Sequence, residues 1–529
     1  MATRGVIAAG HPLTADAGAT MLREGGNAFD AAICAVLASF AAESTLTGLG
    51  AGGFMLAHTA AGENHLLDFF VEAGGRGLDP NSRAELVAAE VVFDETPQVF
   101  NIGPASCGVP GTAAGLWQAA ERFGSIPFTE LVKPAVTLAR EGVDVSAENA
   151  YLFEILEPIV TYYGETRELY APGGKLLREG DTFRFPELAD ALERLAAGGP
   201  ASVYESEVTE RVCEWVCERG GFLSHEDFAS YRVIERDPVE ASYRGRNVLT
   251  NAPPSSGGIL IAFALDLLER FGDPGSLDDP DALARLVESM EESNMARGAD
   301  FDDGLHSESF ASEFLADPHV EEALGRVRER LAEHRPAADE PPPDSLGSTT
   351  HISVMDDRGN AVSVTCSNGT GSGVLVPGTG IHLNNMLGEE DLNPLGFHRH
   401  PPGTRVTSMM APTLVINEGD VELALGSAGS NRLRSAILQA IRYVADYGMP
   451  VQEAIRHGRM HYEAGVLHVE PGFGDAALAD LERRGYEVVR WGRRNLFFGG
   501  AQAVHRDLET GSLAGGGDPR RGGAVVVVE

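Results

Sequence analysis

The sequence predicts an α+β fold in which helices and strand hairpins from both sides of one linker build a single core. Three observations support this fold class. Helical periodicity and period-2 alternation both occur before and after residues 333–348. Residues 333–348 are rich in Pro, Ala, Asp and Glu and form the clearest linker in the chain. The chain shows no internal repeat, so strand layers are expected to face each other around one shared core.

The part of the chain before the linker is expected to begin with two helices and a hairpin. Apolar residues at helical spacing run through 12–43, and Gly25–Gly26 interrupts them as a helix cap would. Residues 52–70, GGFMLAHTAAGENHLLDFF, predict two strands joined by a turn. Helices are expected to dominate 112–235, and the loop that opens 253–272 leads into a further helix.

The pattern changes after the linker. Residues 351–367, HISVMDDRGNAVSVTCS, predict a strand, a turn at 357–360 and a second strand. Residues 421–448 predict a strand, a tight Gly/Ser turn and a long helix. Because both sides of the linker contribute helices and strands, we expect segments 1–348 and 349–529 to form one core together.

Length and charge exclude several classes of function. With 529 residues, 43% of them hydrophobic, the chain can bury a large core. Its formal net charge is −37, which does not suit binding to nucleic acid or to an anionic membrane. Only Lys133 and Lys175 are lysines, so arginine supplies the other 39 cations. Acid spread along a chain with so little lysine indicates adaptation to high salt, where screening weakens self-repulsion.

The sequence also predicts where the protein resides. No apolar run approaches the roughly 20 residues that span a bilayer. The N-terminus lacks the basic leader of a signal peptide. Five scattered cysteines show no disulfide framework, which fits a reducing compartment. We therefore expect a cytoplasmic protein.

Two motifs that resemble cofactor or metal sites do not fit those functions. GLGAGG at 48–53 has the letters of a dinucleotide fingerprint, but a helix is expected before it and a strand after it. A true fingerprint has the reverse order, because the pyrophosphate sits on a helix N-terminus. His398 and His400 lack a nearby cluster of carboxylates or cysteines. We therefore expect neither a cofactor nor a metal.

Thr349 and Thr350 follow the linker directly and open a strand without any capping or turn sequence. A threonine hydroxyl is a weak nucleophile unless a base stands beside it, and its own α-amine is one known solution. That amine exists only if the chain is cut between Ser348 and Thr349. It would titrate near about 7.7–8.0, close to the working pH of a general base.

Acyl transfer also needs hydrogen-bond donors for an oxyanion. GSAGSN at 426–431 lies between a strand end and a helix start, where backbone N–H groups point outward, so we place the donors at Gly429 and Ser430. The competing interpretation is structural: Thr349–Thr350 merely opens a β-strand, and the Gly/Ser turn merely connects two elements. Spacing alone favours this second interpretation.

The motifs taken together resemble the γ-glutamyltransferase (γ-glutamyl transpeptidase) family of the N-terminal-nucleophile hydrolases. The resemblance runs over nearly the whole chain, in family order. It is carried by AAGHPLTADAGATMLREGGNAFDAA, STLTGLGAGGFML, GVPGTAAGL, PPSSGGI, TTHISVMDDRGNAVSVT, PGTGIHLNN, TSMMAPT, GSAGSNR and GGGDPRRGGA. So specific a series overturns the structural interpretation of Thr349.

The resemblance implies a four-layer αββα sandwich of the N-terminal-nucleophile hydrolase type, made as a precursor that cleaves itself. Thr349 attacks the carbonyl carbon of Ser348, the resulting ester is hydrolysed, and segments 1–348 and 349–529 stay together as a heterodimer. Two such heterodimers could associate in turn.

The resemblance also assigns the catalytic residues. Thr349 takes the acyl group of a small γ-glutamyl-type amide and passes it to water or an amine, with its α-amine as the base. Ser367 matches the second hydroxyl residue that contacts the nucleophile. Gly429 and Ser430 match the pair that forms the oxyanion hole.

The substrate pocket departs from the family pattern. Where the family motif reads D-F-R-E this chain reads DFFVEAGG, so Phe70 replaces the arginine that holds the donor's α-carboxylate. Losing that contact should cost on the order of 2–5 kcal/mol of binding free energy. Thr407 and Ser408 match the hydroxyl pair for the same carboxylate, Glu389 matches the acid for the α-amino group, and Asn368 is assigned as the pocket asparagine.

Two further positions bear on the acyl group. Met386 replaces the amide-bearing residue of the family pocket. Arg405 could approach the donor's α-carboxylate, which has no charged partner at Phe70. Alternatively, Arg405 is a structural arginine at the surface.

Three functions follow as alternatives. The first is cleavage of glutathione-type γ-glutamyl amides, which Glu389, Thr407 and Ser408 favour. The second is a glutaryl- or cephalosporin-acylase-like amidase with the same threonine mechanism, which Phe70 and Met386 favour because its acyl group lacks the amino-acid end. The third is a non-catalytic relative that stays uncleaved and binds a ligand.

Overall fold

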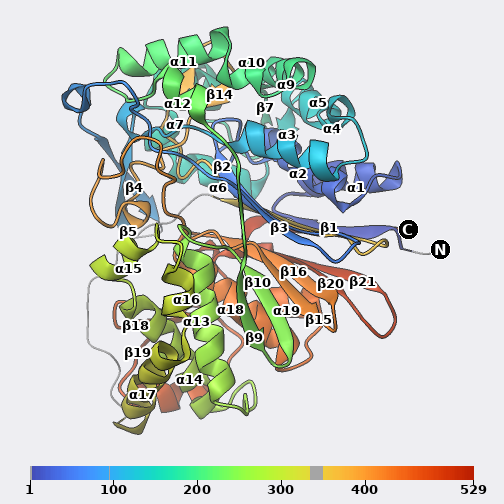
Figure 1. Ribbon diagram of the computed structural model, residues 1–529, viewed down its shortest axis with the longest axis vertical. Helices are drawn as coiled ribbons and strands as arrows, with labels where there is room; N and C mark the ends of the chain where they lie inside the picture. Colours follow the sequence, from blue (N-terminus) through green and yellow to red (C-terminus); the bar gives the residue numbers. More distant parts are fainter. Residues whose placement is uncertain (1–2, 94–95, 334–348) are drawn as a thin grey trace.

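The computed structural model describes residues 3–93, 96–333 and 349–529. In this part of the chain, two large sheets face each other, and helices cover the outer face of each (Figure 1). The helices drawn in blue to green cover one sheet, and those labelled α13, α14, α18 and α19 cover the other. This is the four-layer αββα arrangement, so the predicted α+β fold class is confirmed.

The first sheet has seven strands among the described residues, and every neighbouring pair is antiparallel. In spatial order they are β22 (Ala524–Val528), β1 (Gly5–Ala9), β11 (Thr350–Asp356), β12 (Ala361–Ser367), β2 (Gly52–His58), β3 (Asn64–Phe69) and β8 (Ile234–Arg236). Strands from both sides of the predicted linker are therefore mixed within one sheet.

The second sheet has six strands in the described ranges. In spatial order they are β21 (Leu513–Gly517), β20 (Gly500–Arg506), β16 (Asp420–Ala428), β15 (Thr413–Asn417), β10 (Arg246–Thr250) and β9 (Val239–Tyr243). Apolar side chains from the inner faces of the two sheets, such as Phe54 and Leu56 from one and Leu249 and Val504 from the other, form a shared core. Sheet-on-sheet packing of this kind buries one face of every strand.

Helices complete the outer layers. The first sheet is covered by α1 (Pro12–Arg23), α2 (Ala28–Ala42), α3 (Thr112–Phe123), α5 (Lys133–Glu141) and α9 (Pro186–Gly198). The second is covered by α13 (Ser256–Arg270), α14 (Pro280–Met295), α18 (Arg432–Ala445) and α19 (Val451–Arg456). Every residue of α2 is buried, because the helix lies against β11 and β12 beneath α1, α3 and α5.

Shorter elements connect these layers. The helices are α4 (Phe128–Leu131), α6 (Ala147–Ile155), α7 (Glu157–Val160), α8 (Gly164–Tyr170), α10 (Ala201–Tyr204), α11 (Glu207–Cys217), α12 (His225–Ser230), α15 (Ala299–Gly304), α16 (Phe310–Phe314), α17 (Asp317–Glu333) and α20 (Asp475–Arg483). The strands are β4 (Val87–Phe93), β5 (Thr96–Ile102), β6 (Val143–Asp144), β7 (Thr182–Phe183), β13 (Leu375–Val376), β14 (Ile381–His382), β17 (Met460–Glu463), β18 (Val466–Val469) and β19 (Glu487–Arg490).

The elements expected from the sequence are confirmed. The break at Gly25–Gly26 separates α1 from α2, and Gly25 has a φ of 93°, which a glycine adopts without strain. The two hairpins are β2–β3 and β11–β12. The linker predicted at 333–348 lies, apart from Glu333, outside the described residues.

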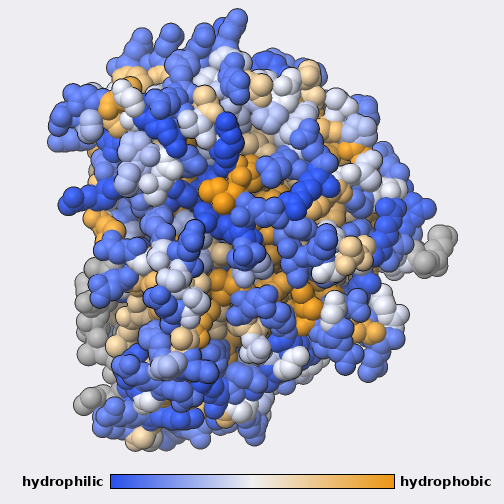
Figure 2. Space-filling view, in the orientation of Figure 1, coloured by the Kyte–Doolittle hydropathy of each residue, from blue (hydrophilic) through white to orange (hydrophobic). Residues whose placement is uncertain are grey.

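Figure 2 shows the distribution of hydropathy on one side of the molecule. Hydrophilic residues cover most of this face, and apolar residues gather near its centre. Among the described residues, no helix is both long and apolar enough to cross a membrane. In the same ranges, no three His, Cys, Asp or Glu side chains are grouped as metal ligands would be.

Candidate active site

Thr349 stands at the head of β11, in contact with the end of β12. In the β11–β12 ladder Thr350 lies opposite Cys366, which brings the preceding Thr349 beside Ser367. The hydroxyl of Thr349 donates to the hydroxyl oxygen of Ser367 at 3.4 Å. Ser367 in turn accepts a hydrogen bond from the backbone N–H of Gly369 at 2.8 Å. Thr349 is 6% exposed, so its hydroxyl is almost out of water.

The predicted oxyanion turn comes from the other sheet. Gly429 and Ser430 follow β16 and precede α18, and both have positive φ, 123° and 48°. A left-handed serine costs about 1–2 kcal/mol, and such strain is typical of functional sites. The Ser430 hydroxyl donates to the carboxylate of Asp391. Ser430 and Thr349 line the same small pocket, so the two sheets bring the nucleophile and the turn together.

This acyl pocket, as we call it, has a volume of about 40 Å³. Six predicted site residues line it: Phe70, Thr349, Ser367, Glu389, Ser408 and Ser430. The remaining walls include Gly369, Met386, Asp391, Leu392, Met409, Met410 and Leu433. Most residues assigned from the sequence therefore meet around one cavity.

Three predicted residues lie beside the acyl pocket without lining it. The Thr407 hydroxyl donates to the backbone oxygen of Leu392 at 2.7 Å. Asn368 is fully buried, and within the described residues its side-chain amide has no hydrogen-bond partner. Gly429 contributes backbone to the turn, and a Cβ placed there would lie 3.0 Å from the Cα of Gly499.

The wall at Phe70 is apolar. Phe70 is fully buried and stacks on Phe54, with ring centroids 5.3 Å apart. Met386, also buried, lines the same pocket. Neither side chain can form a charged contact with a carboxylate, so this part of the pocket offers only apolar packing.

Arg405 does not take the role of a replacement cation. Its guanidinium is buried and forms an ion pair with Asp68 at 3.2 Å and a longer one with Glu72 at 3.5 Å. It also donates to the carbonyl of Phe70 at 2.6 Å and lies 4.8 Å from the centre of the Tyr231 ring. Arg405 is therefore a structural arginine, as the second alternative held, but it is buried and not at the surface. The first alternative, an approach to the uncompensated charge at Phe70, is wrong because these partners hold the side chain.

Glu389 is the acidic residue of the acyl pocket. Its carboxylate accepts from the backbone N–H of Thr370 at 2.9 Å and from the Thr370 hydroxyl at 3.1 Å. Burial raises the pKa of Glu389 to about 7, and the nearby Asp391 also raises it, whereas the hydrogen bonds from Thr370 and Asn385 lower it. Near neutral pH, Glu389 is therefore close to half protonated.

Comparison with known proteins now decides the family. A model of the gamma-glutamyltranspeptidase family matches residues 14–528. The chain belongs to this family. It is an enzyme of this type, so family membership speaks against the third alternative, a binding protein without activity.

Relatives of the chain include proteins named acylase and proteins named glutathione hydrolase. The acylase ACY 1 proenzyme of Pseudomonas sp. strain SE83 is 32% identical over 99% of this chain and 94% of its own length. The glutathione hydrolase proenzyme of Escherichia coli K12 is 29% identical over 98% of this chain and 91% of its own. The crystal structure of cephalosporin acylase from Bacillus halodurans superimposes with a TM-score of 0.85 at 26% identity, covering 100% of this chain and 96% of that one.

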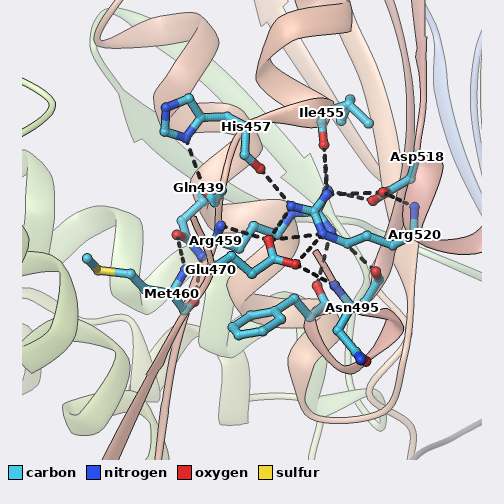
Figure 3. Close-up of polar contacts among 12 residues, drawn as sticks. Gln439, Ile455, His457, Arg459, Met460, Glu470, Asn495, Asp518 and Arg520 are labelled. Atoms are coloured by element: carbon cyan, nitrogen blue, oxygen red, sulfur yellow. Dashed lines mark hydrogen bonds and ion pairs between the residues drawn. The ribbon is translucent and has the colours of Figure 1, made fainter. Parts of the chain in front are cut away.

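This family member has a buried network of four charged side chains, Arg459, Glu470, Asp518 and Arg520 (Figure 3). Arg520 donates to the carboxylates of Glu470 and Asp518, and Arg459 forms an ion pair with Asp518 at 2.7 Å. Asp518 also accepts from the backbone N–H of Ala501 at 2.8 Å. Two arginines against two carboxylates leave no net charge, and each charge is hydrogen-bonded as burial requires.

The network fixes the chain that packs against the turn. The Arg459 guanidinium donates to the carbonyl oxygens of Phe498 at 3.0 Å and of Gly499 at 3.4 Å. A Cβ at Gly499 would lie 2.9 Å from the carbonyl oxygen of Ala428, so this backbone lies directly against the turn that contains Gly429. Arg459 therefore supports the predicted oxyanion donors from behind.

Sequence reasoning missed the polar residues that hold the site residues in place. Asp391 binds Ser430, Thr370 binds Glu389, and the side chain of Asn385 donates to the Thr370 hydroxyl at 2.8 Å. No spacing rule connects these pairs, because they meet through loops rather than along one helix or strand. The motif GDPRR near the C-terminus contributes to the family resemblance, but nothing in its letters indicates the network of Arg520.

Proposed function

We propose that the chain is a self-cleaving amidase and acyltransferase whose nucleophile is the hydroxyl of an N-terminal Thr349. The observation that carries the proposal is the meeting of Thr349 with Ser367 and with the strained turn at Ser430 around one pocket. A nucleophile, a second hydroxyl and a set of backbone donors around a single cavity are the parts that acyl transfer needs.

The first reaction is the cut itself. The Thr349 hydroxyl attacks the carbonyl carbon of Ser348, a residue that lies outside the described ranges. The C–N bond breaks as an ester forms, and the threonine nitrogen becomes an amine. Water then hydrolyses the ester, which frees the Thr349 hydroxyl and leaves 1–348 and 349–529 as two chains that remain one folded heterodimer.

The second reaction repeats this chemistry on a small-molecule substrate. The α-amine of Thr349 takes the hydroxyl proton as the oxygen attacks the amide carbonyl, and the N–H groups of Gly429 and Ser430 stabilise the oxyanion. The amine product leaves with the proton. Water or a second amine then releases the acyl group from the ester.

The acyl group that the pocket supports best is γ-glutamyl, as in glutathione-type donors. Glu389 offers a carboxylate for the donor's ammonium group, and Ser408 offers a hydroxyl beside it. The glutathione hydrolase relatives are consistent with this choice.

A second candidate is the glutaryl-type amide, which lacks the ammonium group. Phe70 and Met386 make two walls of the pocket apolar, and an acyl group with one charge fewer loses less hydration there. The relatives named acylase are consistent with this alternative. Rates on γ-glutamyl and glutaryl anilides separate the two: a faster glutaryl reaction at pH 8 would exclude the first candidate.

Cleavage is tested on the purified protein by intact mass and N-terminal sequencing. We expect two chains, the smaller beginning at Thr349, whereas an uncut protein would run as one 56.1 kDa band. Thr349→Ala should stay whole and show no turnover. A Thr349→Ala protein that is cut and active would end the proposal.

A further inference from the structure

A second cavity adjoins Thr349 and is much larger than the acyl pocket. Its volume is about 520 Å³, and Thr349 and Thr350 form part of its wall. We call it the β1-side cavity because Gly10 and His11, which follow β1, also line it. The acyl pocket lies toward β12, on the other neighbour of the same strand, where Ser367 and Gly369 line it.

The oxyanion turn extends from one cavity to the other. Ala428 lines the β1-side cavity, and Ser430, two residues later, lines the acyl pocket. A carbonyl carbon attacked by Thr349 beside this turn therefore has room on both sides. Its acyl chain and its amine substituent can point into different cavities.

The two volumes differ by more than tenfold. A volume of about 40 Å³ holds only a few water-sized groups, whereas about 520 Å³ falls within the usual range of ligand sites. If the two cavities bind two parts of one substrate, the acyl chain occupies the small pocket, since Glu389 and Ser408 line it. The acyl chain is then the smaller part of the substrate. The bulk of the substrate then belongs to the amine half.

The walls of the β1-side cavity suit a mainly apolar body with a few polar groups. Leu46, Val145, Leu152 and Leu496 provide apolar surface. Glu43 is buried and accepts hydrogen bonds from the hydroxyls of Thr350 and Thr14, both at 2.7 Å.

The lining of the β1-side cavity also includes a cation that acts on Glu43. Arg521 lines the same cavity, and its charge acts on Glu43. Its aliphatic part lies where a Cβ of Gly500 would be, so the side chain runs along the strand that pairs with β16. Arg520, by contrast, is fully engaged in the buried network with Glu470 and Asp518.

We propose that the β1-side cavity binds the amine half of the substrate, a primary amine attached to a bulky, mainly apolar body. The proposal rests on the proposed function. When the tetrahedral intermediate collapses, the C–N bond breaks, the α-ammonium of Thr349 returns its proton to the leaving nitrogen, and the amine is released into this cavity. In transfer, an amine that occupies the cavity attacks the ester.

Filling the cavity tests the proposal. Leu152→Trp on α6 and Leu496→Trp on the loop before β20 narrow it from two separate elements. Leu177→Trp is the matched control, because Leu177 lines a cavity of about 480 Å³ that Thr349 does not touch. Each protein is assayed on two substrates with the same acyl group, a primary amide that releases ammonia and a 4-nitroanilide.

Both cavity variants should lower kcat/KM for the anilide by about tenfold or more while leaving the primary amide within about twofold of wild type, since steric exclusion acts only on the bulky amine. The Leu177→Trp control should change neither. Equal losses on both substrates, or no loss on the anilide, would overturn the proposal.

A binding measurement keeps the proposal testable if neither amide is a substrate. Wild-type protein is titrated with 4-aminobenzoate and followed by ligand-observed NMR. We expect binding that Leu152→Trp and Leu496→Trp weaken and Leu177→Trp does not. Binding of this amine without turnover of either amide would refute the proposed function but not the cavity, and binding that all three variants leave unchanged would refute the cavity.

Discussion

In the proposed reaction, Glu389 is the residue on which the choice of acyl group should depend most. It is buried at the acyl pocket with a pKa of about 7, so both of its protonation states exist near neutral pH. Only the ionised form attracts an ammonium group, and only the neutral form accepts a second carboxylic acid without repulsion. One carboxyl group can therefore serve two kinds of donor at different pH.

The ratio of two donors should report this titration. Above pH 7 Glu389 is ionised and binds the ammonium of a γ-glutamyl anilide, and below pH 7 it becomes neutral and that contact is lost. From pH 8 to pH 6 we expect the γ-glutamyl to glutaryl ratio of kcat/KM to fall by up to about 100-fold, about tenfold from loss of the ionised form that binds the ammonium group and about tenfold from gain of the neutral form that accepts the glutaryl group. Titration of the Thr349 amine affects both donors and cancels in the ratio. Glu389→Gln should remove the trend, and a pH-independent wild-type ratio would contradict it.

Substitution of Phe70 by arginine tests whether the pocket lacks a charged contact to the donor's carboxylate. Phe70→Arg should lower KM by at least about tenfold for γ-glutamyl and glutaryl anilides alike, because both carry a carboxylate that an arginine can pair with. Butyryl anilide, which has no carboxylate, should not gain. Phe70→Leu keeps the wall apolar and serves as the control variant. If the butyryl substrate improved as much as the other two, a charged contact could not be the cause.

For single residues, the sequence predicts which residues belong to the site better than it predicts which residues they contact. The resemblance implies that Ser367 contacts Thr349, and the two hydroxyl oxygens lie 3.4 Å apart in the structure. It could not place Arg405, because the partners Asp68 and Glu72 lie more than 300 positions earlier in the chain. Ion pairs between distant segments depend on the register of the whole sheet, which no local pattern contains.

Among the elements, the predicted oxyanion turn is the one whose displacement should impair the proposed catalysis most. It leaves β16 with two consecutive positive φ angles, and the backbone at Gly499 supports it. Arg459 holds that supporting backbone by its carbonyl oxygens. A small displacement there would move the donors away from the developing oxyanion, which catalysis tolerates poorly.

The Arg459→Lys variant tests whether Arg459 holds the backbone at Gly499 in place against the turn. Lysine keeps the charge beside Asp518 but cannot reproduce the forked contacts, so we expect kcat to fall about 10–100-fold with KM nearly unchanged. Arg442→Lys is the control, because Arg442 is equally buried and pairs with Asp446 at the far end of α18. If both variants lose similar thermal stability and only Arg459→Lys loses kcat, the effect is positional. Equal kcat in the two would contradict it.

Helices and strands could be predicted where the spacing of apolar residues follows a clear helical or strand period. The helices α1, α2 and α18 and the hairpins β2–β3 and β11–β12 follow from spacing alone. The order of strands does not, since β1 lies between β11 and β22, which both follow the linker. Short strands such as β13 and β14 carry too few residues for a period to show.

The whole molecule carries a net charge of −37, with 39 of its 41 basic side chains being arginine. Many of these arginines form exposed ion pairs, such as Arg270 with Asp317 and Glu321. Exposed pairs contribute about 0–1 kcal/mol each and weaken in salt. Repulsion among the surplus acids also weakens in salt, and with so large a surplus we expect that effect to dominate.

Added KCl should therefore stabilise the protein. We expect Tm to rise by about 5–10 °C between 0.05 M and 1 M KCl, with most of the gain below about 0.5 M, because the Debye length is already short there. Differential scanning fluorimetry measures it, with sucrose as an uncharged comparison. A rise that is linear to high salt would indicate solute exclusion instead, and a falling Tm would refute adaptation to salt.

The strand order of the first sheet has a further consequence. Strand β1 from the first segment is hydrogen-bonded on one side to β11 and on the other to β22, both from the second. Either polypeptide expressed alone would present open strand edges with no partner, which favours aggregation. Making the two halves from separate genes should consequently yield active material only when both are synthesised together, and mixing them after each has been purified should fail.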